Sequence, residues 1–506
     1  NPLPEAGLER FKHPQDYMNL DFKSTKLSDF HLQVKIGGDA ALMKGLIKVH
    51  LESGGIDLDF IDNSTTGFQS MCDEVKNTPW DIIVQDSGVK RDLIEKVGEL
   101  CSKSKATIAC WAMGLTQHRN GVSVIQEVVN LLLIGGHVGR KGAGFCPVRG
   151  HSNVQGDRTV GIWEAPSDSF LDRMEMGLKV SLPRKHGYDV VKAIKAMDGN
   201  KVGVFFCMGG NFISATPDTR FTANALSKVD MVVQVSTKLN RSHAVTGKEA
   251  LILPCLGRTE LDIQKSGEQF VSVENSMGIV HMSKGNLKPA SKYLRSEPWI
   301  VSSLAEKTLD KSPISWMKMI ESYDGIRDLM SDCLAGFEDY NSRVKQDNGF
   351  YLPNPPRDER KFDTNDGKAH FTTHKLPNLE VDEGRYVMMT LRSHDQYNTT
   401  IYGLDDRYRG IKGNRRILMM NSIDMLDRTW KTRQRIDITS HFEGQTRVSQ
   451  NWLVIPYDIP SGNIAAYFPE ANELVPLNST AELSNTPTSK WIICSLSESN
   501  SSDEEE

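Results

Sequence analysis

Apolar positions along the chain alternate between two periods, one typical of buried strands and one typical of amphipathic helices. From about His31, short apolar runs are followed by longer segments in which apolar residues recur every three or four positions. This alternation is typical of parallel βα units, so we predict an α/β fold. The predicted strands cover residues 80–85 and 106–113, and the predicted helices cover residues 90–101 and 121–135.

Further along, two predicted strands end in glycine and polar residues. The apolar run 202–208 ends in Gly209-Gly210-Asn211, and the run 231–235 leads into S-T-K-L-N-R-S-H at residues 236–243. Open α/β sheets bind ligands at the carboxyl ends of their strands, so we expect these two segments to share one ligand-binding edge. A Gly-Gly-Asn turn alone is a weak signal, and no G-x-G-x-x-G or G-K-S/T motif is present. His243 has no partner at ligand spacing and is interpreted as a structural histidine.

The pattern changes after Arg385, where short strand-like runs separated by turns replace the βα units. This change predicts a compact β-barrel after a boundary near residues 376–384. Within the barrel region, the polar segments 392–403 and 467–477 are either solvated loops or contacts to a shared ligand. We predict the C-terminal part of one α/β domain at residues 1–118, a second α/β domain at 119–380, the barrel at 381–495 and a disordered acidic tail at 496–506.

One segment, residues 139–161, is rich in glycine and arginine. It reads G-R-K-G-A-G-F-C-P-V-R-G-H-S-N-V-Q-G-D-R-T-V-G. Glycine lets backbone N–H groups approach a ligand, and Arg140, Arg149 and Arg158 carry planar guanidinium groups suited to phosphate or carboxylate. Composition alone leaves two interpretations evenly balanced: an anion-binding loop, or a long irregular loop packed on the protein itself.

Composition excludes several classes of protein. The chain has 506 residues, 39% hydrophobic and 25% charged, with a net charge of −5, so no nucleic-acid-binding surface is expected. The longest apolar run, residues 128–136, is too short to span a bilayer. No two of the eight cysteines form a C-x-x-C pair, which argues against a zinc site, an iron–sulfur site or a disulfide framework in this chain. The chain begins with Asn1 rather than Met and has no signal-peptide character, which indicates the interior of a larger protein and leaves an upstream targeting segment open.

Several long motifs, in a fixed order, resemble a known family. They are W-A-M-G-L-T-Q-H (111–118), N-L-L-L-I-G-G-H-V-G-R-K-G-A-G (130–144), C-P-V-R-G-H-S-N-V-Q-G-D-R-T-V-G (146–161), S-T-K-L-N-R-S-H (236–243) and R-S-H-D-Q-Y-N-T-T-I-Y-G-L-D-D-R-Y-R-G (392–410). Together they resemble the formate-dehydrogenase-like molybdopterin oxidoreductases of the dimethyl sulfoxide reductase superfamily, in the predicted oxidoreductase alpha-subunit branch. The resemblance covers residues 1–495, and it implies two parallel-sheet cofactor-binding domains followed by a double-psi-type β-barrel.

The family also implies a cofactor, bis(molybdopterin guanine dinucleotide) with molybdenum or tungsten. By resemblance, Arg149 faces the metal and orients an anionic substrate, or else binds a cofactor phosphate. The family's metal ligand, a cysteine or selenocysteine, and any 4Fe-4S cluster lie in an N-terminal third that is missing here, so no metal ligand is assigned. The residues implied to contact the cofactor are His151, Asn153, Gln155, Gly209, Gly210, Asn211, Ser236, Thr237, Lys238, Asn240, Arg392, His394, Gln396, Tyr467, Asn472 and Lys490.

Two hypotheses of different class follow. The first is a cytoplasmic redox enzyme that carries out two-electron chemistry on formate or a similar small substrate and passes electrons to a partner. The second is a relative that binds the cofactor as a scaffold and has lost turnover. A sugar-nucleotide-binding α/β protein is a third and weaker interpretation, which the barrel motifs disfavour. The sequence does not identify the substrate, the electron partner or the oligomeric state.

Overall fold

A computed structural model describes residues 1–11, 24–309 and 311–499 of the chain. The chain divides into two compact units. One unit comprises Asn1–Phe145, Ser214–Arg220 and Pro355–Glu506, and the other comprises Cys146–Ile213 and Phe221–Asn354. The predicted division into two α/β domains and a barrel stays a prediction.

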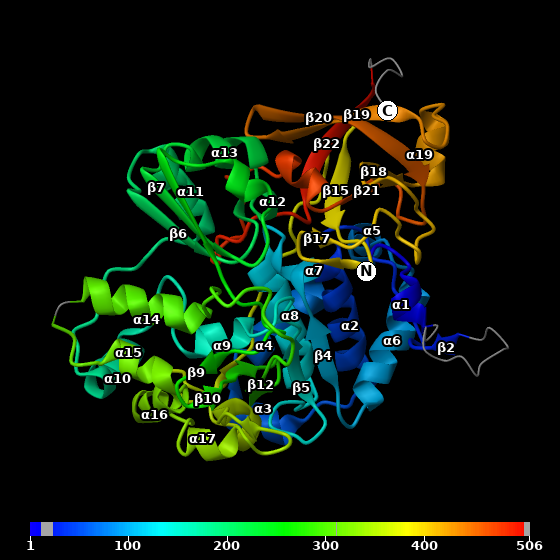
Figure 1. The fold of residues 1–506 in the computed structure, drawn as a ribbon. Coiled ribbons are helices and arrows are strands. Elements are labelled where there is room, and N and C mark those ends of the chain that lie inside the picture. The colour runs from blue at the N-terminus through cyan, green and yellow to red at the C-terminus, as the bar shows by residue number, and fades with distance from the viewer. Residues whose placement is uncertain (12–23, 310, 500–506) are drawn as a thin grey trace. The chain divides into compact units, whose positions relative to one another are not determined.

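Helix α2 is the centre of the helical part of the first unit (Figure 1). It packs against α4, α5, α6 and α8, and its buried face joins the largest apolar cluster. Gly45 lies where a Cβ would meet Ile94 and Ile83 at 2.9 and 3.0 Å, so the absence of a side chain allows close packing. The helices here are α2 (Asp39–Ser53), α3 (Leu58–Ser64), α4 (Phe68–Asn77), α5 (Trp80–Ser87), α6 (Arg91–Lys103), α7 (Met113–Thr116) and α8 (Gly121–Ile134).

The predicted helices over residues 90–101 and 121–135 are confirmed as α6 and α8, and the predicted strand over 106–113 is confirmed as β4 (Ile108–Trp111). The predicted strand over 80–85 is wrong, because these residues form helix α5. Pro79 precedes the helix and Gly88, with a φ of 71°, ends it in the left-handed conformation. Proline before a helix and glycine after it are common boundary residues, and they outweigh the short apolar run.

A closed six-stranded barrel forms the C-terminal part of the first unit (Figure 1). Its strand order is β15, β21, β18, β20, β19, β22, with β15 parallel to β21 and β18 parallel to β20. Its interior is filled by Trp452, Met388, Ile464 and other fully buried side chains. The predicted barrel is therefore confirmed, with strands β15 (Tyr386–Leu391), β18 (Ile417–Met420), β19 (Arg435–Phe442), β20 (Gln445–Pro456), β21 (Asn463–Tyr467) and β22 (Ile492–Glu498).

Two details of the barrel differ from the prediction. Segment 467–477, considered as a polar loop, is mostly buried, since it follows strand β21 and contributes Leu474 and Val475 to the core. Strand β22 continues to Glu498, past the predicted start of the disordered tail, because Leu496 is buried in the barrel. Residues 500–506 of that tail lie outside the described residues.

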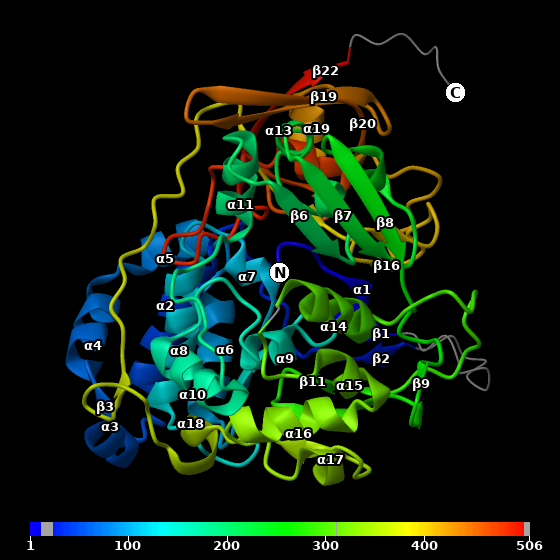
Figure 2. The same cartoon turned by 60° about the vertical axis from the view of Figure 1, so that its left-hand side comes forward.

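The second unit contains a three-stranded parallel sheet, in the order β6, β7, β8 (Figure 2). The strands β6 (Val204–Met208) and β7 (Met231–Ser236) confirm the two strands predicted at 202–208 and 231–235, and β8 (Glu249–Pro254) follows them. Helix α11 (Val190–Asp198) is capped by Asp189, whose side chain accepts a hydrogen bond from the Lys192 amide. The polar segments predicted to share a sheet edge thus follow adjacent parallel strands.

The remainder of this unit is helical, with a small antiparallel sheet. Phe337, Tyr340 and Phe350 pack edge to face in its core, with ring centroids 4.8 to 6.2 Å apart. Its elements include α9 (Val154–Thr159), α10 (Asp168–Leu178), α14 (Glu297–Thr308), α15 (Trp316–Glu321), α16 (Asp324–Cys333), α17 (Tyr340–Arg343), β11 (Val271–Glu274), β12 (Ile279–Ser283) and β13 (Phe350–Tyr351).

Candidate functional site

The carboxyl edge of the parallel sheet brings two predicted segments together. The side-chain amide of Asn240 donates to the Gly210 carbonyl at 2.8 Å, and Asn211 accepts from Ser242 at 3.0 Å. Gly209 and Gly210 have φ values of 69° and 79°, and a Cβ on either would meet nothing within 4 Å. These glycines therefore leave open space where a ligand can approach the backbone.

Ser236 and His243 form hydrogen bonds that fix the backbone of this edge. Ser236 is buried, and its hydroxyl lies 3.0 Å from Nε2 of His243. Nδ1 of the same ring accepts from the Asn240 amide at 3.0 Å. His243 is thus structural, as the sequence indicated, and the exposed polar residues of the segment are Thr237, Lys238 and Arg241.

Arg149 lies in the glycine-rich segment with its guanidinium held by Gln155. Nε and Nη2 donate to the Gln155 side-chain oxygen at 3.1 and 2.9 Å. Its backbone amide donates to Ser276 at 3.1 Å. The outer end of the guanidinium, Nη1 together with the second N–H of Nη2, makes no protein hydrogen bond within the described parts of the chain. Gln155, predicted to contact a pterin, here orients Arg149.

The other predicted residues of the segment differ in exposure. His151 is exposed. Asn153 has a φ of 67°, and its side-chain oxygen accepts from the Glu274 amide at 3.0 Å, so it shapes the turn. Burial raises the pKa of Glu274, against the effect of a hydrogen bond from Thr159 and of Arg149.

The other two arginines of this segment form ion pairs. Arg140 pairs with Asp57 at 2.8 Å and also donates to the Lys105 carbonyl, and Arg158 lies 3.7 Å from Glu164. Arg140 and Arg158 thus have internal partners, whereas the outer end of the Arg149 guanidinium has none among the described residues. Anion binding by this segment stays a prediction.

On the barrel, Arg392 and Lys490 are two neighbouring cations. The Lys490 ammonium donates to the Thr390 carbonyl, two residues before Arg392. Arg392 lies over the Phe468 ring at 4.4 Å, and its buried Nε has no hydrogen-bond partner. Neither cation pairs with a carboxylate anywhere in residues 1–11, 24–309 and 311–499. This arrangement fits an anionic group.

His118 adds to this cluster and was not singled out from the sequence. It is 6% exposed, and the Lys490 amide donates to the carbonyl of the preceding residue, Gln117, at 3.1 Å. Burial, then the charge of Lys490, lowers the pKa of His118 to about 4. The only signal in the sequence was its place at the end of the motif at 111–118.

The remaining predicted barrel residues have internal partners. Asp406 accepts from Nδ1 of His394 at 3.1 Å and from the Tyr467 hydroxyl at 2.9 Å. Gln396 donates to the Asn398 and Phe468 carbonyls at 2.6 and 2.7 Å. Asn472 donates to the Ser214 and Thr216 carbonyls at 2.8 and 3.1 Å and so ties segment 214–220 to the barrel. Cofactor contacts by these four residues stay predictions.

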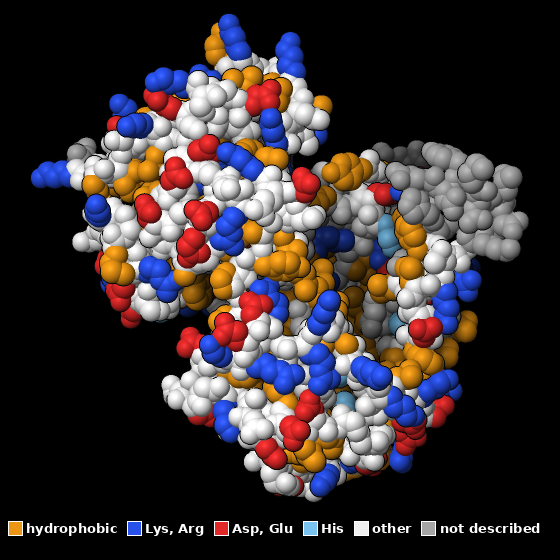
Figure 3. All heavy atoms as spheres, turned by 90° about the horizontal axis from the view of Figure 1, so that it is seen from below, with side chains coloured by type: hydrophobic (Ala, Val, Ile, Leu, Met, Phe, Trp, Pro, Cys, Tyr) orange, Lys and Arg blue, Asp and Glu red, His pale blue; other side chains and the backbone are white. Residues whose placement is uncertain are grey.

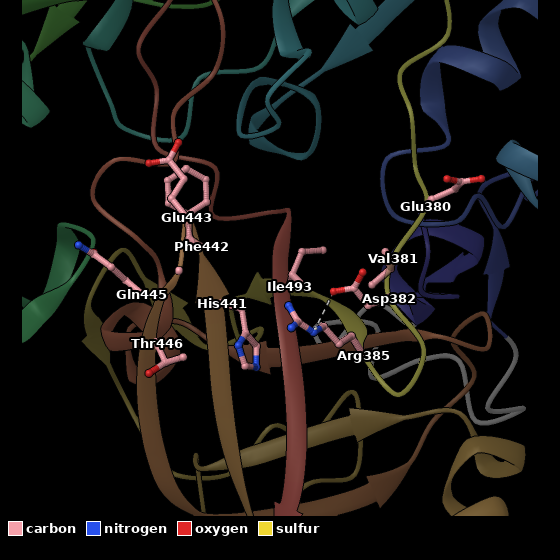
Figure 4. Close-up of a pocket in the computed structure, with 11 residues that line it drawn as sticks. Glu380, Val381, Asp382, Arg385, His441, Phe442, Glu443, Gln445, Thr446 and Ile493 are labelled. Carbon is pink, nitrogen blue, oxygen red and sulfur yellow. Dashed lines mark ion pairs between the residues drawn. The ribbon is translucent and has the colours of Figure 1, made fainter.

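A separate pocket on the barrel contains none of the predicted residues. Its volume is about 430 Å³, and Figure 4 shows Arg385 beside Asp382, with His441 nearby. Arg385 and Asp382 lie 3.4 Å apart, and His441 is 2.7 Å from the Ser495 hydroxyl. Three carboxylates line this pocket, at Glu380, Asp382 and Glu443, so it does not suit an anionic cofactor.

Within the described residues, no three or more His, Cys, Asp or Glu side chains are arranged to hold a metal ion. No helix within the described ranges is both long and apolar enough to cross a membrane. On the face drawn in Figure 3, Lys and Arg side chains are interspersed with Asp and Glu side chains.

Comparisons with known proteins agree with the motifs. A family model described as Molybdopterin oxidoreductase matches residues 18–284. The chain is 47% identical, over 98% of its length, to an "uncharacterized oxidoreductase" of Mycobacterium tuberculosis, and it spans 65% of that relative's length. It is 40% identical to protein YdeP of Escherichia coli (strain K12), over 99% of its length and 68% of the relative's.

More distant similarities extend this result. The chain is 26% identical, over 60% of its length, to the F420-dependent formate dehydrogenase subunit alpha of Methanocaldococcus jannaschii, and covers 44% of that protein. Acetylene hydratase from Pelobacter acetylenicus has a similar fold, with a TM-score of 0.65 and 14% identity over 93% of this chain and 72% of that one. The chain therefore belongs to the molybdopterin oxidoreductase family, within the fold of the dimethyl sulfoxide reductase superfamily and at a distance from the formate dehydrogenases.

Proposed function

We propose that this chain binds bis(molybdopterin guanine dinucleotide), with molybdenum or tungsten, and takes part in the two-electron oxidation or reduction of a small substrate. The observation that carries the proposal is the pair of cations on the barrel, Arg392 and Lys490, which have no carboxylate partner among the described residues. In a member of the molybdopterin family, the anionic cofactor is the natural counter-charge.

The sheet edge would hold a guanine dinucleotide. Gly209 and Gly210 leave their backbone open to a phosphate, and the Asn240 side chain fixes the turn that presents them. Thr237 and Lys238 are exposed beside them and can donate to phosphate oxygens. When bound, such a cofactor supplies the two-electron redox chemistry at its metal.

Arg149 would orient the substrate. Gln155 holds one side of its guanidinium, so the outer N–H groups keep a fixed direction and can bind both oxygens of a small carboxylate. The similarity to a formate dehydrogenase makes formate the first substrate to test. The metal ligand, any 4Fe-4S cluster and the electron partner belong to the whole protein, of which the chain spans 65% in the mycobacterial relatives.

Turnover of formate by the purified protein, measured with a dye as electron acceptor, tests this proposal. We expect Arg149→Ala to lower kcat/KM by about 100-fold or more, as is typical when a donor to a reacting anion is removed. The pterin content should stay unchanged. Arg149→Lys keeps the charge but loses the planar arrangement of donors, and we expect intermediate activity.

Other outcomes would revise the proposal in distinct ways. Loss of pterin from Arg149→Ala would mean that this arginine binds the cofactor rather than the substrate. A protein that contains metal and pterin but turns over neither formate nor other small carboxylates and oxyanions would support the scaffold hypothesis instead.

A further inference from the structure

An arginine shortly after the third strand of the parallel sheet has no role in the proposed function. Arg258 lies four residues after β8, and its side chain is exposed. Its Nη1 donates to the Ser152 hydroxyl at 2.5 Å, and its Nε donates to the Ser283 hydroxyl at 3.0 Å. Ser152 lies midway between Arg149 and Gln155 in the sequence. Arg258 is therefore held against the segment that carries the proposed substrate-binding arginine.

Arg258 forms no ion pair with a carboxylate in the described parts of the chain. Both of its acceptors are neutral hydroxyl groups. The carboxylate nearest in sequence, Glu260, accepts instead from the Gly257 and Ala290 backbone amides, at 2.6 and 2.9 Å. Because a guanidinium keeps its proton in proteins, the positive charge of Arg258 is available to a ligand.

The hydrogen bonds of Arg258 also leave one side of its guanidinium open. Nη2 makes no hydrogen bond to any residue that the structure describes. Arg149 is held in a similar way, since Gln155 accepts from one side of its guanidinium and the outer N–H groups stay unbonded. Neutral groups thus fix the direction of both arginines, which reduces the conformational entropy that each loses when it binds a ligand.

The carboxylate that acts on Arg149 from strand β11 is Glu274. It is 7% exposed, and it forms no ion pair with Arg149. Burial raises its pKa, against the effects of Thr159 and Arg149, and so favours its neutral form. Glu274 therefore offsets the charge of Arg149 less than an exposed carboxylate in an ion pair would.

Two neighbouring guanidinium groups select the charge of a ligand. Their acceptors, Ser152 and Gln155, are three residues apart, so the Cα atoms of these two residues are at most about 11 Å from one another. A monoanion such as formate compensates one of the two positive charges. A small dianion compensates both, and it offers acceptor oxygens to the open donors of each arginine.

We propose that Arg258 is a second anion-binding residue of the substrate site, and that Arg149 and Arg258 together favour a small substrate with two negative charges over a monoanion. A dicarboxylate and a compact oxyanion share this chemistry. The inference rests on the proposed function, because it takes Arg149 as the substrate-binding arginine.

Calorimetric titration of the cofactor-loaded protein tests this pair, with malonate and sulfate as dianions and acetate as the monoanion. Without an electron donor or acceptor, binding alone is measured. We expect at least one dianion to bind about tenfold or more tightly than acetate, and Arg258→Gln to remove most of this preference. Tighter binding of malonate would indicate a dicarboxylate, and tighter binding of sulfate a compact oxyanion. Equal affinity for all three in the wild-type protein would overturn the proposal.

The ratio of dianion to acetate affinity separates ligand binding from a purely structural role. If Arg258 only ties Ser152 to the end of the sheet, Arg258→Gln should weaken acetate and the dianions alike, which would contradict the proposal. Arg258→Lys keeps the charge and should retain part of the preference. Arg173→Gln is the matched control, because Arg173 is an exposed arginine of α10 in the same unit, and it should bind all three anions as the wild type does.

The cofactor content of the same preparations separates this inference from the proposed function. Loss of pterin from Arg258→Gln would assign this arginine to the cofactor and overturn the inference. Protein that loads metal and pterin but lacks the preference for dianions would keep the proposed function and lose the inference. If wild-type protein loads neither, the proposed function fails, and the same titrations of the 506-residue chain and its Arg258→Gln variant still decide whether Arg258 binds dianions.

Discussion

The neighbours of Arg149 determine what its guanidinium can do. Gln155 accepts hydrogen bonds from the Nε side, and the backbone is tied to Ser276, so the outer N–H groups point in one direction. A freely rotating arginine would lose more conformational entropy on binding a substrate. The hydrogen bonds to Gln155 thus fix the Arg149 guanidinium in a direction from which it can bind the proposed carboxylate substrate. A glutamine that contacted only a pterin would not fix the arginine in this way.

The buried His137 is expected to make the protein less stable at acid pH. It is 2% exposed, and burial, then the charges of Arg140 and His50, lowers its pKa to about 4. In the unfolded chain its pKa returns to about 6.5, so the unfolded state binds a proton first as pH falls. The free energy of unfolding is therefore unaffected by this histidine above about pH 6.5. It falls as the pH drops from there toward 4, by up to about 3 kcal/mol. We expect the Tm to fall between pH 7 and 5, and to fall less steeply in His137→Gln.

His186 provides the matched control for this prediction, since its side chain is exposed. His186→Gln should retain the full acid dependence of the wild-type protein. If His137→Gln and wild type lose stability in parallel as the pH falls, the buried ring of His137 is not the group responsible.

Single residues were predicted unevenly from the sequence. The turn at Gly209 and Gly210 followed from its position at a strand end, and the structural role of His243 followed from the lack of a partner at metal-ligand spacing. Gln155 and Gln396 could not be assigned in the same way. A side-chain amide can bond to a ligand or to the protein, and only the folded chain brings Arg149 and the Phe468 carbonyl to them.

At the scale of elements, the buried ion pairs of Lys44 on α2 connect three helices of the first unit. Lys44 is 1% exposed and lies 3.5 Å from Glu127 of α8 and 3.6 Å from Glu74 of α4. Lys44→Met would leave the buried Glu127 carboxylate with one remaining hydrogen bond among the described residues, donated by the Asn130 side-chain amide. We expect a loss of about 3 to 5 kcal/mol of unfolding free energy in denaturant titrations, because a buried charge without its partner is costly.

A double variant distinguishes this cause from lost packing. Lys44→Met combined with Glu127→Gln removes both charges and should be more stable than Lys44→Met alone. Lys103→Met, in an exposed ion pair with Glu99, should change stability little. A double variant less stable than the single one would attribute the loss to packing.

Helices and strands whose apolar residues recur with one clear period were predicted correctly from the sequence. Short apolar runs without such a period were not. Helix α8 has apolar residues on a continuous face, and strands β6 and β7 end at glycine or polar residues. The run at α5 has the length of a strand, and its helical state depends on Pro79 and Gly88. Strand β21, N-I-A-A-Y, is buried on both faces, so it lacks the alternation by which half-buried strands are identified.

For the molecule as a whole, the family and the barrel could be predicted because long motifs and the change of pattern after Arg385 are properties of the sequence itself. The chain spans 65% of the length of its mycobacterial relatives, and its substrate and electron partner stay proposals. The chain itself contributes a sheet edge with open glycines and a pair of cations that have no carboxylate partner in the part of the chain that the structure describes.

The central claim is that these features bind a molybdopterin cofactor, and it is tested most directly by the metal and pterin content of the purified protein. Elemental analysis and the fluorescence of the oxidised pterin should reveal molybdenum or tungsten together with about two pterins per metal, as the bis form of the cofactor requires. The variant with Arg392→Ala and Lys490→Met should lose most of both. Purified, folded protein that contains neither metal nor pterin would contradict the account.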